Sequence, residues 1–235
     1  MFLKLLLLVA LIAGAPPLSS AEPCPGPEAP ARIAQTASLD TSDGPIEIRA
    51  IEAPGTSQPP RLVLLGASCH PLLSLALGGV GREDPGPEPF PRLLRFRIDR
   101  VDGLPRPLLV ATGAVVGGSD TLFETQLIAH EGGEYRALLH TPVRSLIEGG
   151  FYVGDLGPRI GPGIADWGLL WSAGESRVGP HRWALHRKRW DGREFRELPT
   201  LTTREKHEDA TSALRELGVH YPDMTRAIAD FEPYR

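Results

Sequence analysis

The sequence is poor in cysteine and lacks the short motifs that mark the common enzyme families. Cys24 and Cys69 are the only two cysteines among 235 residues, and no C-x-x-C pair occurs, which argues against zinc ribbons and thioredoxin-like redox centres. There is no P-loop, no G-x-G-x-x-G after a strand and no H-E-x-x-H. Ser172 in LLWSAG lacks the leading glycine of a nucleophile elbow. The sequence therefore predicts no catalytic residue and no cofactor.

Strong positive charge and long apolar runs are also lacking beyond the first residues. The net charge is −4, which argues against nucleic-acid binding. No later segment is long and apolar enough to cross a bilayer. The seven histidines are scattered. His181 and His186 are five apart, which places them on opposite faces of a strand, so they are not expected to share a metal ion.

The N-terminus has the layout of a secretory signal peptide. Lys4 is followed by an apolar run over 5–15, and Ser19-Ser20-Ala21 supplies small residues before Glu22. Pro23, just before Cys24, does not fit lipoprotein processing. We expect residues 1–21 to be removed and the mature chain to be periplasmic or secreted, without a transmembrane segment.

Export into an oxidising compartment makes a disulfide between Cys24 and Cys69 the simplest expectation. Closing a loop of this length stabilises the fold by roughly 4 kcal/mol in the chain-entropy model. The alternatives are a redox pair or a metal site that uses the neighbouring His70.

Many short strands joined by turns are predicted by the composition. The 26 glycines and 24 prolines make up about a fifth of the chain, against roughly an eighth in average usage. Residues 71–78 fit a strand or a short helix, and residues 79–91 read as a loop. The predicted strands lie within 32–53 (a hairpin), 61–67, 92–98, 107–113, 121–130, 134–139, 163–171, 181–190 and 193–198.

Two nearly matching phrases occur sixty positions apart, HEGGEYRAL at 130–138 and WDGREFREL at 190–198. They predict equivalent hairpins in two repeats of a β-rich unit. The apolar segments 61–67 and 107–114 also read as equivalent strands of successive units. A period of this size is typical of propellers or stacked arrays. In each hairpin the aromatic residue is expected to face the core and the following arginine to face away: Tyr135 and Phe195, then Arg136 and Arg196.

The C-terminal tail over 202–235 predicts two short helices packed on the β unit. A capping box over Thr202–Glu205 predicts the start of the first helix, and Gly218 is its expected end. The second helix would start near Pro222. The apolar stripes are Ala210, Ala213, Leu214 and Leu217, then Met224, Ala227, Ile228 and Phe231. We expect one β-repeat domain over 32–201, with a proline-rich lead-in at 22–31.

The segments GDLGPRIGPGIADWG (154–168), RWDGREF (189–195) and TTREK (202–206) resemble the repeats of bacterial exported proteins of the FG-GAP and VCBS types. Those families resemble the β-propeller of integrin α chains. The resemblance implies a mainly β, repeat-built, propeller-like antiparallel fold.

The calcium loops of such repeats are degenerate here. Asp99 and Asp102 flank Arg100, and the second turn keeps only Asp155, which is too few carboxylates for calcium. Asp102 and Asp155 are expected to cap their turns. Three recognisable units leave open a fourth blade, an open β assembly closed by the helices, or a dimer.

Residues 166–190 contain all four tryptophans of the chain together with Asp166, Glu175 and His181. The alternation predicts that Trp167 and Trp183 are core residues, whereas Trp171 and Trp190 lie beside loops. Basic residues crowd the same hairpin. The candidate binding surface is therefore Trp171, Trp190, Arg182, Arg187, Lys188 and Arg189, with a solvated edge strand as the alternative reading of the basic residues.

These features predict a non-catalytic exported β-repeat module that binds a protein or an anionic glycan at the cell envelope. The alternatives are an exported hydrolase with a dispersed active site and a purely structural envelope protein.

Export can be tested on protein from its native host. Because the small residues at 19–21 precede Glu22, we expect mass spectrometry to find a chain that begins at or near Glu22. A full-length mass recovered from a membrane fraction would contradict this prediction.

Overall fold

The computed structural model describes residues 24–42, 44–56, 58–78, 92–117, 120–146, 148–171 and 179–221. Three expected features lie outside these ranges: the signal peptide, the loop over 79–91 and the second C-terminal helix.

The described chain forms three antiparallel sheets. Sheet A contains β1 (Arg32–Thr41), β2 (Gly44–Glu52), β3 (Arg61–Leu65) and β4 (Pro71–Ala76). Sheet B contains β5 (Arg92–Asp99), β6 (Leu108–Gly117), β7 (Asp120–Glu131), β8 (Glu134–Ala137) and β9 (Val143–Leu146). Sheet C contains β10 (Gly150–Asp155), β11 (Pro162–Leu170), β12 (Arg182–Trp190), β13 (Phe195–Glu197) and β14 (Leu201–Thr202). The prediction of a mainly β protein is confirmed.

Sheets B and C share one plan. Three strands pair in chain order, and the fourth position is divided between two short strands. In sheet B, β8 pairs with residues 128–131 of β7 and β9 pairs with residues 122–125. In sheet C, β13 pairs with residues 188–190 of β12 and β14 pairs with residues 184–185. Sheet A is a simple four-stranded meander.

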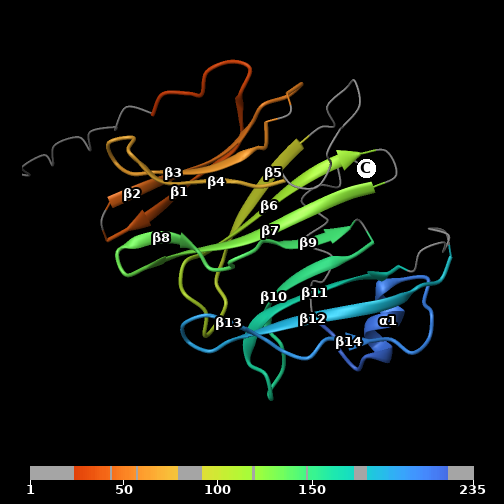
Figure 1. Ribbon diagram of the computed structural model, residues 1–235. Coiled ribbons are helices and arrows are strands. Elements are labelled where there is room, and N and C mark those ends of the chain that lie inside the picture. The colour runs from red at the N-terminus through yellow and green to blue at the C-terminus, as the bar shows by residue number, and fades with distance from the viewer. Residues whose placement is uncertain are drawn as a thin grey trace, which may run out of the picture.

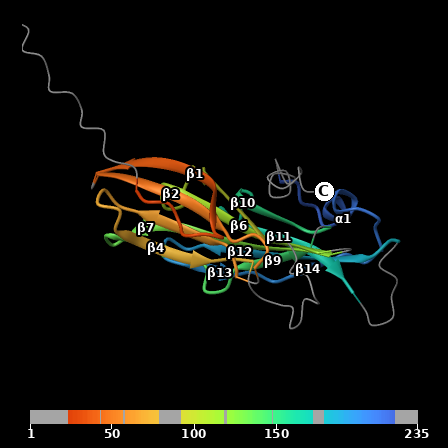
Figure 2. The same ribbon diagram turned by 90° about the horizontal axis from the view of Figure 1, so that it is seen from above.

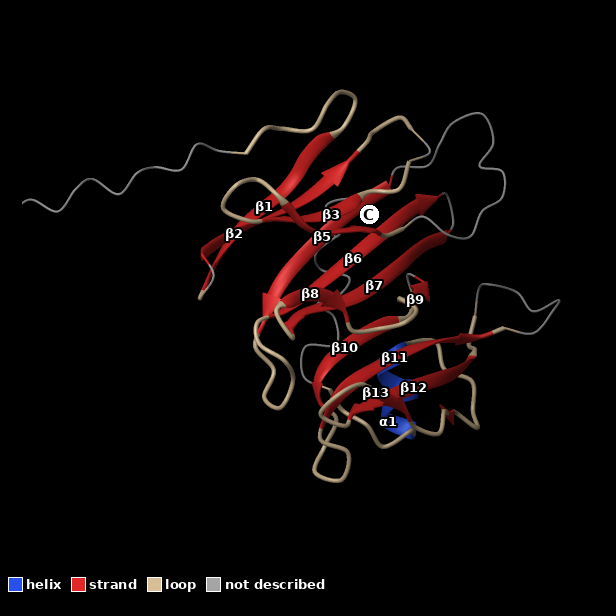
Figure 3. Ribbon diagram, turned by 60° about the vertical axis from the view of Figure 1, so that its left-hand side comes forward, coloured by secondary structure: helices blue, strands red, loops and turns tan. Residues whose placement is uncertain are grey.

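The sheets lie one above another, with sheet B in the middle (Figures 1 and 3). The view from above shows that the three sheets overlap (Figure 2). The three largest buried clusters fill the layers. The A–B core includes Ile48, Leu62, Leu94 and Ile128. The B–C core includes Leu108, Leu127, Ile164 and Trp190. The third core joins sheet C to the helix and includes Trp167, Trp183, Leu185 and Leu214.

The helix α1 (Ala210–Glu216) covers the face of sheet C that points away from sheet B (Figure 3). Its predicted apolar stripe is confirmed, because Ala213 and Leu214 are buried and Ala210 and Leu217 pack beside them. Gly218 follows its end with φ +69°. No helix in the described ranges is long and apolar enough to cross a bilayer.

The predicted capping box at Thr202 is wrong. Thr202 lies in β14 and pairs with Ala184, so the chain is still extended there. The helix starts eight residues later, where the Asp209 side chain accepts a hydrogen bond from the backbone N–H of Ser212 at 2.8 Å. An Asp in that role satisfies an otherwise unpaired N–H of the first turn.

Side chains of sheet A bind the open edge of β5 in sheet B. The Gln35 side chain donates to the carbonyl of Phe96 at 2.7 Å and accepts from its N–H at 2.9 Å. The buried carboxylate of Glu52 accepts from the N–H of Leu94 at 2.9 Å and from Arg95 at 2.8 Å. These bonds satisfy backbone groups that an edge strand would otherwise leave unpaired.

The lead-in is held against sheet A by two attachments. Cys24 and Cys69 form a disulfide with a Cα–Cα distance of 5.4 Å, which confirms the predicted bridge. The buried Arg49 guanidinium donates to the carbonyls of Cys24 and Pro25 at 2.7 and 2.6 Å.

The repeated phrases form equivalent hairpins, as predicted. His130 lies opposite Tyr135, and Trp190 lies opposite Phe195. The rings of the two pairs are 4.8 and 4.9 Å apart. In both hairpins an arginine, Arg136 or Arg196, pairs with the acid at the start of the turn. Positive φ values of +62° at Gly132 and +98° at Gly192 allow the turns.

Other parts of the repeat prediction need correction. The segment 61–67 supplies β3, the third strand of sheet A, whereas 107–114 supplies β6, the second strand of sheet B. They are therefore not equivalent. The described sheets form an open stack with sheet A at one end and α1 at the other, and they do not close into a ring (Figure 1). Tyr135 and Phe195 are half-buried against the A–B and B–C cores.

Equivalent substitutions in the two hairpins should change stability by similar amounts. Truncating Tyr135 or Phe195 to Ala should lower the free energy of unfolding by about 2 kcal/mol, because half of a large aromatic contact is lost. Arg136→Ala and Arg196→Ala should each cost under about 1 kcal/mol, because their ion pairs are solvated. Urea denaturation of the four variants measures this. An arginine variant less stable than its aromatic neighbour would reverse the assigned faces.

Candidate functional site

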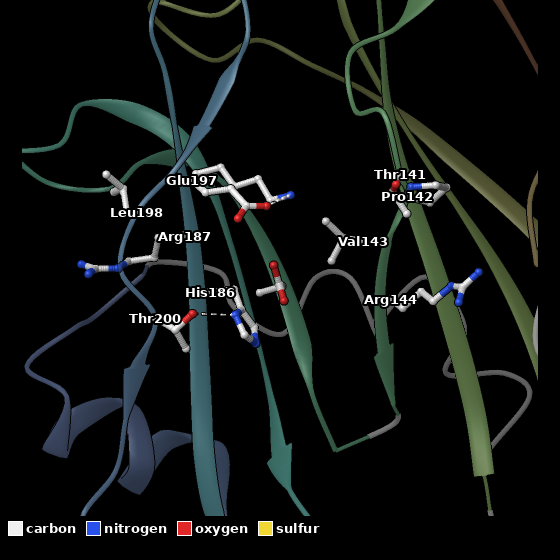
Figure 4. Close-up of a pocket in the computed structure, with 11 residues that line it drawn as sticks. Thr141, Pro142, Val143, Arg144, His186, Arg187, Glu197, Leu198 and Thr200 are labelled. Carbon is white, nitrogen blue, oxygen red and sulfur yellow. Dashed lines mark hydrogen bonds and ion pairs between the residues drawn. The ribbon is translucent and has the colours of Figure 1, made fainter.

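A polar pocket of about 210 Å³ lies between sheets B and C. On the sheet B side it is bounded by Thr141 and Pro142 and by the first two residues of β9, Val143 and Arg144. On the sheet C side it is bounded by Asp166 of β11, residues 186–188 of β12, and Glu197, Leu198 and Thr200. Figure 4 shows Val143 and Arg144 on one side and His186, Thr200 and Glu197 on the other.

Sheets B and C share one plan, so sheet B shows which residues occupy the corresponding positions when they are packed in a core. In sheet B, Ala111 lies opposite Gln126, and Ile128 follows two residues later on the same face. Ala111 and Ile128 are fully buried in the A–B core, and Gln126 is 2% exposed. The corresponding residues of sheet C are Asp166, His186 and Lys188, with Asp166 opposite His186. Sheet C therefore presents three ionisable side chains to sheet B where sheet B presents a packed core to sheet A.

One substitution explains why the pocket stays open at His186. Gln126 bridges the gap between β8 and β9, because its side chain donates to the carbonyl of Leu139 at 2.9 Å and accepts from its N–H at 3.1 Å. The residue of sheet C that corresponds to Leu139 is Pro199, which has no N–H to donate. The ring of His186 instead bonds the hydroxyl of Thr200, with 3.0 Å between Nδ1 and Oγ1 (Figure 4).

Asp166 is the least satisfied of these groups. Within the described part of the chain its carboxylate has no hydrogen bond or ion pair. Burial raises the pKa of Asp166 from 3.8 to about 6, while His186 and Lys188 lower it and Glu197 raises it further. A partly buried carboxylate without a partner is costly unless a ligand supplies a donor.

The surrounding charges are largely paired. Lys188 lies 3.2 Å from Glu197, whose side chain is 80% exposed at the rim. Arg144 lies 2.9 Å from Glu124, which also accepts the N–H of Gly78 at 2.8 Å. The pocket therefore combines both signs of charge with no large excess of either.

The arrangement does not reproduce a hydrolytic triad. In a triad the histidine bonds the nucleophile through one ring nitrogen and a carboxylate through the other. Here the hydroxyl of Thr200 is bonded to Nδ1, and Asp166 makes no hydrogen bond to the ring. Within the described ranges there is also no group of three or more His, Cys, Asp or Glu side chains that could hold a metal ion.

A second hollow, near 97–102 and 151–155, brings together the turns predicted to be degenerate calcium loops. Their carboxylates are already engaged. Asp99 pairs with Arg97 at 2.8 Å, and Asp102 pairs with Arg106. Asp155 accepts the N–H of Gly157 at 2.9 Å, so its predicted turn-capping role is confirmed, whereas Asp102 binds a side chain instead.

The six residues predicted as a binding surface do not form one surface. Trp190 is only 8% exposed and packs in the B–C core, so its assignment to the surface is wrong. Alternation along β12 places Arg182 and Lys188 toward sheet B, and Arg187 and Arg189 on the opposite face. Figure 4 shows Arg187 on the far side of β12 from Arg144.

Trp171 is 37% exposed at the end of β11 and contacts the ring of His181 edge-on, with centroids 5.8 Å apart. Trp167 and Trp183 are buried, as predicted. Of the predicted surface residues, Lys188 and Arg187 border the pocket.

Sequence reasoning noted Asp166 but missed His186, Glu197, Thr200 and Arg144. The signal was present in the repeat itself. Aligning the two phrases and extending them backward sets Gln126 against His186 and Ile128 against Lys188. A charged residue at a position where the equivalent sheet has a buried apolar residue indicates that the position is not part of a packed core.

The chain matches no protein-family model, no curated protein and no solved structure.

The unusual pKa of Asp166 makes stability depend on pH. Its folded-state pKa lies above the unfolded value, so the folded state is favoured by protonation, and stability is lost as pH rises through about 6. Asp166→Asn removes this penalty. Its gain in free energy of unfolding should be near zero at about pH 4 and should reach at most about 3 kcal/mol at about pH 7.5.

Denaturation of wild type and Asp166→Asn across this pH range measures the difference, with the exposed Asp40→Asn as control. A difference that does not change with pH would show that Asp166 titrates as an exposed carboxyl group does.

Proposed function

We propose that this protein is a non-catalytic exported module that binds a protein or glycan partner at the cell envelope, and that the pocket between sheets B and C holds a polar group of that partner. The observation that carries the proposal is the exchange of Ala111 and Ile128 in sheet B for Asp166 and Lys188 in sheet C. Polar groups inside an interface cost stability, so their presence favours a role outside folding.

The disulfide supports export, because such bridges persist in oxidising compartments. The three antiparallel sheets are each four strand positions wide, with the fourth position of sheets B and C divided between two short strands. This width supports the proposed kinship with FG-GAP and VCBS-type repeats, since four-stranded antiparallel sheets are the blades of propellers. The split of the basic residues between two faces of β12 weakens the case for an anionic partner. The partly buried carboxylate of Asp166 favours a partner that offers a hydrogen-bond donor.

The double variant Asp166→Ala/Lys188→Ile restores the residues that sheet B carries at these positions. It should fold at least as well as wild type, because it replaces a polar pocket with core residues. Co-sedimentation with isolated cell envelopes of the native host should fall by about tenfold or more. Asp40→Ala, at an exposed position of β1 in sheet A, is the matched control and should bind as wild type does.

Each alternative function gives a different result. A purely structural envelope protein would sediment equally well with and without the pocket. A hydrolase would release soluble fragments from the envelopes during incubation, and the double variant would stop that release.

A further inference from the structure

We propose that the group held in the pocket between sheets B and C is a saccharide unit, recognised through neighbouring hydroxyls that bridge Asp166, His186 and Lys188. This inference rests on the proposed binding function and specifies the ligand class.

The hydrogen-bonding capacity left in the pocket requires both a donor and an acceptor. Asp166, which has no bonding partner within the described residues, can only accept when ionised. Across the strand pair, His186 uses Nδ1 on Thr200 and keeps Nε2 for a ligand. The ammonium of Lys188 has three donor positions, and the solvated Glu197 occupies one side of it. A hydroxyl both donates and accepts, so a pair of adjacent hydroxyls satisfies all three groups.

The charges disfavour strongly ionic ligands. The groups that face Asp166 are His186 and Lys188 from β12, Glu197 from β13 and, across the pocket, Arg144 from β9. Arg144 is neutralised by Glu124. A carboxylate or phosphate would be repelled by Asp166, and a lone ammonium would be repelled by Lys188. Neutral hydroxyls avoid both costs.

The size and walls of the pocket fit one small ring. Its volume of about 210 Å³ lies below the roughly 300 Å³ at which pockets for drug-sized molecules begin. Pro142, Val143 and Leu198 give it apolar surface, which suits the C–H faces of a sugar. The exposed side chains of Arg144 and Glu197 mark its rim, where the rest of a glycan chain would leave the pocket.

Binding should weaken in acid. A protonated Asp166 is a poorer acceptor, and the group protonates as pH falls through about 6. The loss should be larger for wild type than for Asp166→Asn, which cannot ionise. Comparing the two variants isolates the contribution of Asp166 from the other ionisable groups at the pocket.

Isothermal titration calorimetry of the exported chain at about pH 7.5 tests the ligand class. The probes are cellotriose, maltotriose, mannotriose, chitotriose and trigalacturonate. At least one of the four neutral trisaccharides should bind. Asp166→Asn and Asp166→Ala should weaken that binding by about 10- to 100-fold, the loss of a charge-assisted hydrogen bond. Asp40→Asn should leave it unchanged.

Three results would overturn the assignment of a saccharide recognised through neutral hydroxyls. The first is binding of trigalacturonate alone, with Asp166→Asn tightening it, because the ligand group would then be an anion. The second is binding of neutral trisaccharides that both Asp166 variants leave intact. The third is no binding of any probe while the envelope co-sedimentation still depends on the pocket, in which case the binding function stands and the ligand is not a sugar. If the pocket variants also leave envelope binding unchanged, the proposed function itself fails.

Discussion

A β-sheet with apolar side chains on both faces needs a cover on each side, and this requirement organises the molecule. Sheet B lies between sheets A and C and buries residues such as Ile128 on one face and Leu127 on the other. Among the described residues, sheet C has one neighbouring sheet, and α1 covers its second face with Ala213 and Leu214. The helix therefore occupies the place that a further sheet would take in a longer stack.

The same packing rule explains why the pocket is informative. Layers stacked by hydrophobic burial gain stability from every apolar residue they enclose, so an ionisable residue in such a layer must be solvated, paired or used. Glu52 and Glu124 are paired and bonded to backbone N–H groups of a neighbouring segment, which gives them a structural role. Within the described part of the chain Asp166 makes no such bonds, and it borders the pocket. This difference distinguishes a structural carboxylate from one that is available to a ligand.

Local patterns predicted most of the strands, because alternation and turn residues are properties of short segments. The hairpins at Gly132 and Gly192 and the bridge between Cys24 and Cys69 followed from such patterns or from pairing. The start of α1 was misplaced because Thr202 fits a helix cap locally, yet its pairing with Ala184 in sheet C extends the chain. The face on which Trp190 lies, and the meeting of His186 with Arg144 around one pocket, depend on how sheets stack, which no single segment encodes.

The strands of each sheet follow one another directly along the chain, so the fold can be built layer by layer as the polypeptide emerges N-terminus first. Sheet A can form before sheet B is synthesised. The side chain of Gln35 then lacks its hydrogen-bond partner until Phe96, 61 residues later in the chain, is in place. The helix is the last described element to appear. Until it docks, Trp167 and Trp183 remain uncovered on one face of sheet C. A chain cut short before Ala210 would expose this apolar face permanently, and cellular quality control would recognise it as an unfinished product.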